Sequence, residues 1–133
     1  MSNEKIKRRW PQAASQERLT HLLGLPSHEH MQDWELECAN SERIEEFLSL
    51  YESGSLTDDD RFAVMALIVF SFDDWLLAEG KNEGIIQRVR QHLSADFDLH
   101  VATIHYWCCD DESNPEYIFT CTPFMREILA QHT

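Results

Sequence analysis

Residues 57–75 read TDDDRFAVMALIVFSFDDW, and this stretch decides the fold because its middle is apolar on every side. A helix without a polar face must be covered by other elements all round, so it locates the core. Thr57 is placed to cap this helix, with Asp60 three residues later as the acid of a capping box. The aspartates at its start also suit the positive end of the helix dipole. The working surface is therefore expected at the charged ends or outside this helix.

Asp73 and Asp74 fit less well, because acids at the negative end of a helix cost about 0.3–1 kcal/mol each. The simplest explanation is that one of them caps a new short turn over residues 75–79. The pair could also contact a partner. A third interpretation is that they are paired carboxylates for acid–base chemistry or for Mg²⁺.

Length and composition are those of one globular domain over residues 1–133, with 43% hydrophobic and 11% aromatic residues. The net charge of −13 is uneven, since residues 1–10 sum to +3 and residues 11–133 therefore carry −16. Residues 1–12 are expected to be a flexible basic arm. The basic residues of this arm are Lys5, Lys7, Arg8 and Arg9.

The acidic body bears on the class of partner. Such a field repels nucleic acid and anionic membranes, while it speeds the encounter with a basic protein. The four cysteines come without an apolar leader at the N-terminus, which favours a reduced, cytoplasmic setting. The longest apolar run, Phe62–Phe70, is far shorter than the ~18 residues that a membrane span needs. No cofactor and no metal are expected.

Amphipathic spacing predicts four further helices, within residues 15–23, 41–52, 82–93 and 122–129. Gly24 and Gly54 are expected to end the first two of them. Thr122 is expected to cap the last one, with Pro123 at its first helical position.

Three segments predict strands instead. Asp33–Cys38 alternates polar with apolar residues, which is typical of a strand with one dry and one wet face. Leu99–Trp107 and Tyr117–Cys121 are rich in β-branched and aromatic residues, and the polar residues 111–115 between them indicate a hairpin tip. The predicted fold is therefore α+β: a helix-rich single domain with a buried central helix and a small, mostly antiparallel sheet of roughly three strands.

Motifs for catalysis or metal binding are weak. His28 and His30 would share one face of a strand, and imidazole suits zinc, but the segment follows Pro26 in a predicted loop and lacks a third ligand nearby. A solvated loop is the simpler interpretation. His100 and His105 would face opposite sides of a strand and make a poor pair. The sequence has no nucleophile elbow and no glycine-rich phosphate loop, so nothing specifies an enzyme.

The predicted hairpin tip is the best candidate surface. It places three acids beside aromatic residues, and aromatic anchors with a charged rim are typical of protein interfaces. The alternative is a solvated turn with Trp107 in the core. Glu35 and Glu37 would extend the same negative patch if their strand lay near the hairpin. The candidate partner-binding residues are Asp110, Asp111, Glu112, Trp107, Tyr117, Glu35, Glu37, Asp73 and Asp74.

The chain resembles the small acidic immunity proteins that bacteria make against contact-dependent or polymorphic toxins. The resemblance rests on size, on Trp34-Glu35-Leu36-Glu37, on the Thr57–Asp60 helix start and on the acidic tip. It implies a non-enzymatic protein that neutralises a basic, nuclease-type toxin by occlusion. The class has no shared signature, so no residue role is carried over. The alternatives are a small metal-dependent hydrolase using Asp73, Asp74 and the histidines, and a structural homodimer.

Overall fold

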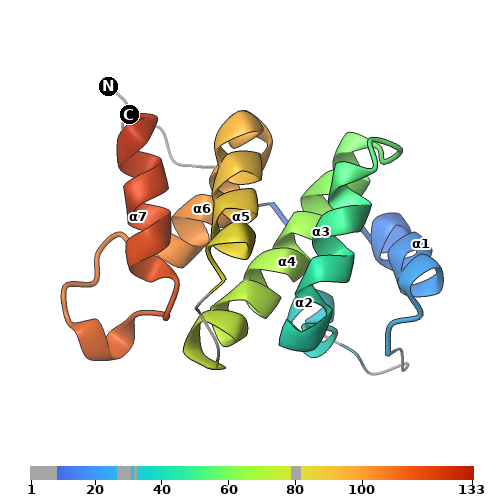
Figure 1. The fold of residues 1–133 in the computed structure, drawn as a ribbon, viewed down its shortest axis with the longest axis horizontal. Helices are drawn as coiled ribbons and strands as arrows, with labels where there is room; N and C mark the ends of the chain where they lie inside the picture. The colour runs from blue at the N-terminus through green and yellow to red at the C-terminus, as the bar shows by residue number, and fades with distance from the viewer. Residues whose placement is uncertain (1–8, 27–30, 32, 79–81) are drawn as a thin grey trace. The chain divides into compact units, whose positions relative to one another are not determined.

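The computed structural model describes residues 9–26, 31, 33–78 and 82–133, and in these ranges the regular structure is helical (Figure 1). The chain forms two compact units, an N-terminal unit over Trp10–Asn82 and a C-terminal unit that includes Glu83–Thr133. No strand occurs in the described ranges, so the predicted α+β class is wrong. The single domain over residues 1–133 stays a prediction. The helices are α1 Ala13–Leu23, α2 Trp34–Glu37, η1 Ser41–Arg43, α3 Ile44–Glu52, α4 Asp58–Ala78, α5 Glu83–Ala95, α6 Phe97–Cys108, η2 Pro115–Tyr117 and α7 Thr122–Gln131, where η marks a 3-10 helix.

Helix α4 is the buried central helix of the N-terminal unit, as the sequence predicts. All eight residues of Phe62–Val69 are at most 6% exposed, and α1, α2, η1 and α3 pack against this helix. The expected break after Asp74 is wrong, because α4 continues to Ala78. Trp75 is buried and stacks on Phe72 with ring centroids 5.9 Å apart, so its packing keeps the helix intact past the two acids. Residue 79 lies outside the described ranges.

The strand predicted over Asp33–Cys38 is the short helix α2. A strand would bury Trp34, Leu36 and Cys38 together, since alternate residues share a face. Instead Trp34 and Cys38 are 3% and 2% exposed, while Leu36 between them is 53% exposed. Two buried residues four positions apart fit the helical period. The alternation in Asp33–Cys38 covers only six residues, which is too short to distinguish a helical period from a strand period. The Trp34 indole N–H donates to Thr20 Oγ1 at 2.9 Å, which ties α2 to α1.

The predicted hairpin is also helical. Leu99–Trp107 lies within α6, and Tyr117–Cys121 is the end of η2 and the turn before α7. Packing of α6 against α5 and α7 overrides the β-branched composition, because β propensity depends on context. The buried residues of α6 follow the helical positions i, i+3, i+4, i+7 and i+8: His100, Thr103, Ile104, Trp107 and Cys108.

The helices predicted from amphipathic spacing are confirmed as α1, α3, α5 and α7. Gly24 follows α1 with φ 61° and Gly54 follows α3 with φ 75°, both in the left-handed region where glycine ends helices most easily. Within the described ranges, no helix is long and apolar enough to cross a membrane, α4 included.

Candidate interaction surface

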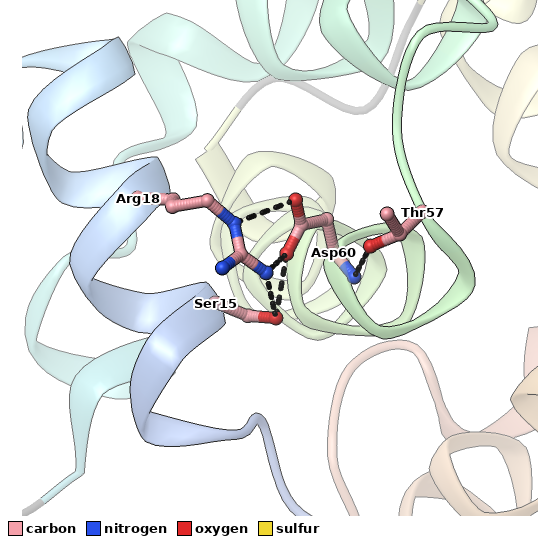
Figure 2. A network of polar contacts seen from close by, with 4 residues as sticks. All are labelled: Ser15, Arg18, Thr57 and Asp60. Carbon is pink, nitrogen blue, oxygen red and sulfur yellow. Dashed lines mark hydrogen bonds and ion pairs between the residues drawn. The ribbon is translucent and has the colours of Figure 1, made fainter.

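A polar network holds the first turn of α4 on α1 (Figure 2). The carboxylate of Asp60 accepts hydrogen bonds from Ser15 Oγ at 2.6 Å, from Arg18 Nη2 at 2.6 Å and from Arg18 Nε at 3.2 Å. The backbone N–H of Asp60 donates to Thr57 Oγ1 at 3.2 Å, which confirms Thr57 as the helix cap. The predicted capping-box role of Asp60 is wrong, because its carboxylate points to α1 instead. Asp60 therefore has a structural role, which is to hold α4 against α1.

Electrostatics agree with a structural role for Asp60. Asp60 is 7% exposed. The hydrogen bonds from Arg18 lower the pKa of its carboxyl below the ordinary value, and this effect exceeds that of burial, which raises the pKa. The same pair raises the pKa of Arg18. The carboxylate is therefore charged at neutral pH and already has its cation.

The other candidate acids of the N-terminal unit lie on α2 and α4. Glu35 is half-buried, and burial raises its pKa, while Glu37 accepts a hydrogen bond from the backbone N–H of Asp33 at 3.1 Å. Asp73 is partly exposed and Asp74 is exposed. Adjacent residues of a helix point about 100° apart, so these two carboxylates are poorly arranged to share one ion.

Metal chemistry finds no support in the part of the chain that the structure describes. No group of three or more His, Cys, Asp or Glu side chains could hold an ion there. His28 and His30 lie outside the described residues. His100 is fully buried, whereas His105 Nδ1 lies 2.9 Å from Asp110 Oδ2.

The remaining candidates gather where α6 ends. Helix α6 terminates at Cys109, whose φ of 50° is left-handed. Arg126 of α7 caps this end: its Nε donates to Cys108 O at 2.7 Å, and its Nη2 donates to Cys109 O at 2.8 Å and Glu112 O at 2.7 Å. A cation at a helix C-terminus satisfies the last carbonyls and suits the dipole. Sequence reasoning missed Arg126, because its partners are backbone atoms that no side-chain pattern reveals.

Aromatic rings cover this end of α6. Trp107 is 2% exposed and lies under Phe119, with ring centroids 4.4 Å apart, so of the two sequence interpretations the structure places this residue in the core. Phe119 also stacks with Tyr106 at 5.9 Å and 24° between the rings. Tyr106 and Phe119 are 52% and 36% exposed, and we call them the aromatic platform. Tyr117, at 69% exposed, lies in the same connection.

Thr122 fastens the platform to α6. Its hydroxyl accepts a hydrogen bond from the backbone N–H of Phe119 at 2.9 Å and donates to Trp107 O at 2.8 Å. The predicted role of Thr122 as the cap of α7 is wrong, since Cys121 occupies that position and Thr122 is the first helical residue. A hydroxyl that could cap its own helix instead connects two distant parts of the chain.

Three consecutive acids, Asp110, Asp111 and Glu112, follow directly, and we call them the acidic turn. Asp110 and Asp111 are exposed. The backbone N–H of Glu112 donates to Cys109 O at 2.9 Å, so the chain reverses at this point. Residues 105–119 include four acids and no lysine or arginine. The last turn of α6 and the connection that follows it thus carry an acidic turn and exposed rings, held by Arg126 and Thr122.

Cys108, in the last turn of α6, has a thiol that is unreactive at neutral pH. Burial raises the pKa of the Cys108 thiol to about 12, so it stays protonated at neutral pH. Among the four cysteines, all free thiols, Cys38, Cys108 and Cys121 are buried.

Comparison of the chain with protein-family models, with curated proteins and with solved structures finds no match. The resemblance to immunity proteins therefore stays a prediction. The surface at the end of α6 is the candidate functional site.

Proposed function

We propose that this protein is a non-enzymatic binding protein that captures a basic protein partner with the acidic turn and the aromatic platform. The observation that supports this most is that two exposed, mutually stacked rings, Tyr106 in the last turn of α6 and Phe119 after it, occur beside three consecutive acids in the chain. Protein interfaces typically combine aromatic anchors with a polar or charged rim. The surface has both parts.

Anchoring of the surface favours binding. Arg126 holds the backbone at Glu112 of the acidic turn and at Cys109 directly before it, and Thr122 fixes Phe119 to the last turn of α6. A surface that is ordered before binding loses less conformational entropy when a partner arrives. The net charge of −13 adds long-range attraction for a cationic protein and a salt-sensitive association rate.

One form of this function is that of an immunity protein, which neutralises a basic toxin by occluding it. Enzymes that act on nucleic acid need cationic surfaces to bind phosphates. An acidic surface with aromatic anchors competes for such a site. A toxin gene beside the gene for this chain would support this form, and the candidate toxin could be tested directly for binding.

The test is affinity capture from an extract of the source cells at low and at high salt. It compares the wild-type chain with a variant whose acidic turn is neutralised by Asp110→Asn, Asp111→Asn and Glu112→Gln. The matched control removes three exposed acids elsewhere, by Glu17→Gln, Glu42→Gln and Glu83→Gln.

We expect one basic protein that is captured by the wild type and by the control at low salt. It should be lost at high salt and lost by the acidic-turn variant. Equal loss in both variants would mean that only total charge matters, and capture that ignores both salt and the acidic turn would refute the proposal.

A further inference from the structure

Three arginines in the described ranges share one local arrangement. Each guanidinium lies over an aromatic ring and pairs with a carboxylate at the same time. The distances from the guanidinium carbon to the ring centroid are 5.3, 5.1 and 4.9 Å in chain order. The sets are Arg43 with Phe47 and Glu46, Arg61 with Tyr51 and Asp58, and Arg90 with Phe124 and Glu127.

The physical basis of this arrangement is general. The face of an aromatic ring is electron-rich and attracts the flat cation, while the edge of the guanidinium donates hydrogen bonds to a carboxylate. The two contacts use different parts of the guanidinium and do not compete. A ring beside a carboxylate is therefore a receptor for arginine in particular.

The end of α6 offers the same two chemical groups on its surface. The platform rings of Tyr106 and Phe119 are partly exposed, and Asp110 follows Tyr106 by four residues, a chain length that spans at most about 14 Å. The turn closed between Cys109 O and the N–H of Glu112 keeps the later acids near the same end of α6. The guanidinium of Arg126 is bound to three backbone carbonyls of this connection.

We propose that the aromatic platform and the acidic turn form an arginine-binding site for an arginine side chain of the basic partner. This inference rests on the proposed function and names the chemistry by which the same surface recognises its partner. The guanidinium stacks on the Tyr106 and Phe119 pair, and its N–H groups donate to the carboxylates of the acidic turn. The occupant is an arginine of a second protein, since residues 105–119 contain no lysine or arginine. His105 Nδ1 lies 2.9 Å from Asp110 Oδ2, so the exposed Asp111 is the acid of this turn to which the incoming guanidinium donates first.

Lysine satisfies this site less well. Its ammonium is compact and strongly hydrated, and it lacks the flat face that stacks on a ring while hydrogen bonding at its edge. Lysine and arginine have equal charge, so a site that depends on net charge alone would bind them equally. A preference for arginine thus separates this inference from simple charge attraction.

The test uses the full chain and two capped synthetic peptides of equal length, one of alternating Gly and Arg and one of alternating Gly and Lys. Dissociation constants are measured by NMR titration in low-salt buffer. Four proteins are compared: the wild type, Tyr106→Leu, which removes the ring but keeps an apolar side chain, Tyr106→Phe, which keeps the ring, and Trp10→Leu as the control for an exposed ring in the N-terminal unit.

We expect the arginine peptide to bind the wild type about threefold more tightly than the lysine peptide, with the largest shifts at Tyr106 and Phe119. Tyr106→Leu should bring this ratio to about one, whereas Tyr106→Phe and Trp10→Leu should keep it. Thermal unfolding of each variant shows whether a lost preference is a lost fold, and a Tyr106→Leu chain that is folded and keeps the ratio overturns the inference.

Equal binding of the two peptides also overturns it. If that equal binding still disappears when the acidic turn is neutralised, the proposed capture of a basic partner stands and only the arginine site fails. Binding of neither peptide refutes the arginine site and removes the charge argument for the proposed function as well.

Discussion

The chain contains two runs of three acids that lie at opposite ends of helices, Asp58–Asp60 at a helix start and Asp110–Glu112 after a helix end. The first run begins α4, where the helix dipole is positive, and its last member is buried against Arg18 and Ser15. The second run follows the end of α6, where the dipole is negative. In the first run an arginine binds the carboxylate, whereas in the second Arg126 binds backbone carbonyls.

This difference shows why composition alone cannot tell a structural acid from a surface acid. At a helix start, the backbone N–H groups and a nearby guanidinium can absorb a carboxylate into the fold. At the end of α6 the nearby guanidinium of Arg126 is bound to backbone carbonyls. The acids there have smaller local partners, His105 for Asp110 and the backbone N–H of Asn114 for Glu112, and Asp111 is exposed. Whether an acidic run lies at the start of a helix or after its end thus influences whether its carboxylates become part of the fold.

The largest test of the comparison is Asp60→Ala. It removes a buried acceptor from Ser15 and Arg18, so we expect the free energy of unfolding to fall by about 2–3 kcal/mol in urea denaturation. Asp59→Ala, an exposed change one residue earlier, should cost less than about 1 kcal/mol. Equal losses for the two variants would show that Asp60 is not a structural acid.

The pH dependence of Asp60 gives a second test. Arg18 lowers the pKa of Asp60 in the folded chain, so its stabilisation is complete above its ordinary pKa of 3.8 and is lost as the pH falls through the lower folded value. The difference in unfolding free energy between the wild type and Asp60→Asn should therefore be constant from pH 7 to about pH 5 and shrink below about pH 4. A difference that grows on acidification would contradict the assignment.

Arg126→Gln tests the other side of the comparison. It removes the guanidinium that satisfies three carbonyls at the end of α6, and we expect a loss of about 1–2 kcal/mol in the free energy of unfolding. Faster amide hydrogen exchange in residues 108–112 should accompany it. Arg126→Lys should recover only part of the loss, because a single ammonium cannot reach all three oxygens.

Cys109→Gly tests the backbone conformation directly before the acidic turn. Cys109 has φ 50°, where a β-carbon is crowded, so glycine should raise the free energy of unfolding by about 0.5 kcal/mol after its own entropic cost. Cys109→Ala retains the β-carbon and should bring no such gain. Thermal unfolding under reducing conditions distinguishes the two variants.

The smallest expected effect is the change in the free energy of unfolding when a single exposed acid is neutralised, and its sign should differ between the two runs. Asp111→Asn should stabilise the fold by about 0.3 kcal/mol, because it removes a negative charge after a helix end. Asp58→Asn should destabilise it by a similar amount at a helix start. Parallel chemical denaturation of both variants checks the signs, and the same sign for both would break the comparison.

The sequence predicted α1, α3, α4, α5 and α7 because each has a hydrophobic period or a clear start and stop signal. The run from Phe62 and the caps at Thr57, Gly24 and Gly54 are strong local signals. Local chemistry and tertiary packing agree at these points. That agreement is why those elements could be predicted.

The errors arose where packing opposed local preference. Helix α6 contains Val101, Thr103 and Ile104, which favour strands. Its helical pattern of burial begins at the fully buried His100, which is not recognised when only hydrophobic residues are counted as core positions. Helix α2 is too short for its period to be recognised. The candidate surface stays a prediction, and sequence reasoning missed Phe119, Thr122 and Arg126 because their roles depend on tertiary contacts.

The uniform burial of α4 has a consequence for how this protein can vary. An ordinary surface helix tolerates polar replacements along one side, so its sensitivity to substitution rises and falls with each turn. Residues Phe62–Val69 have no such side, since each is buried. Polar substitution is therefore disfavoured at eight consecutive positions, and we expect variation among descendants of this chain to accumulate on exposed helix faces and in the connections, which include part of the proposed binding surface.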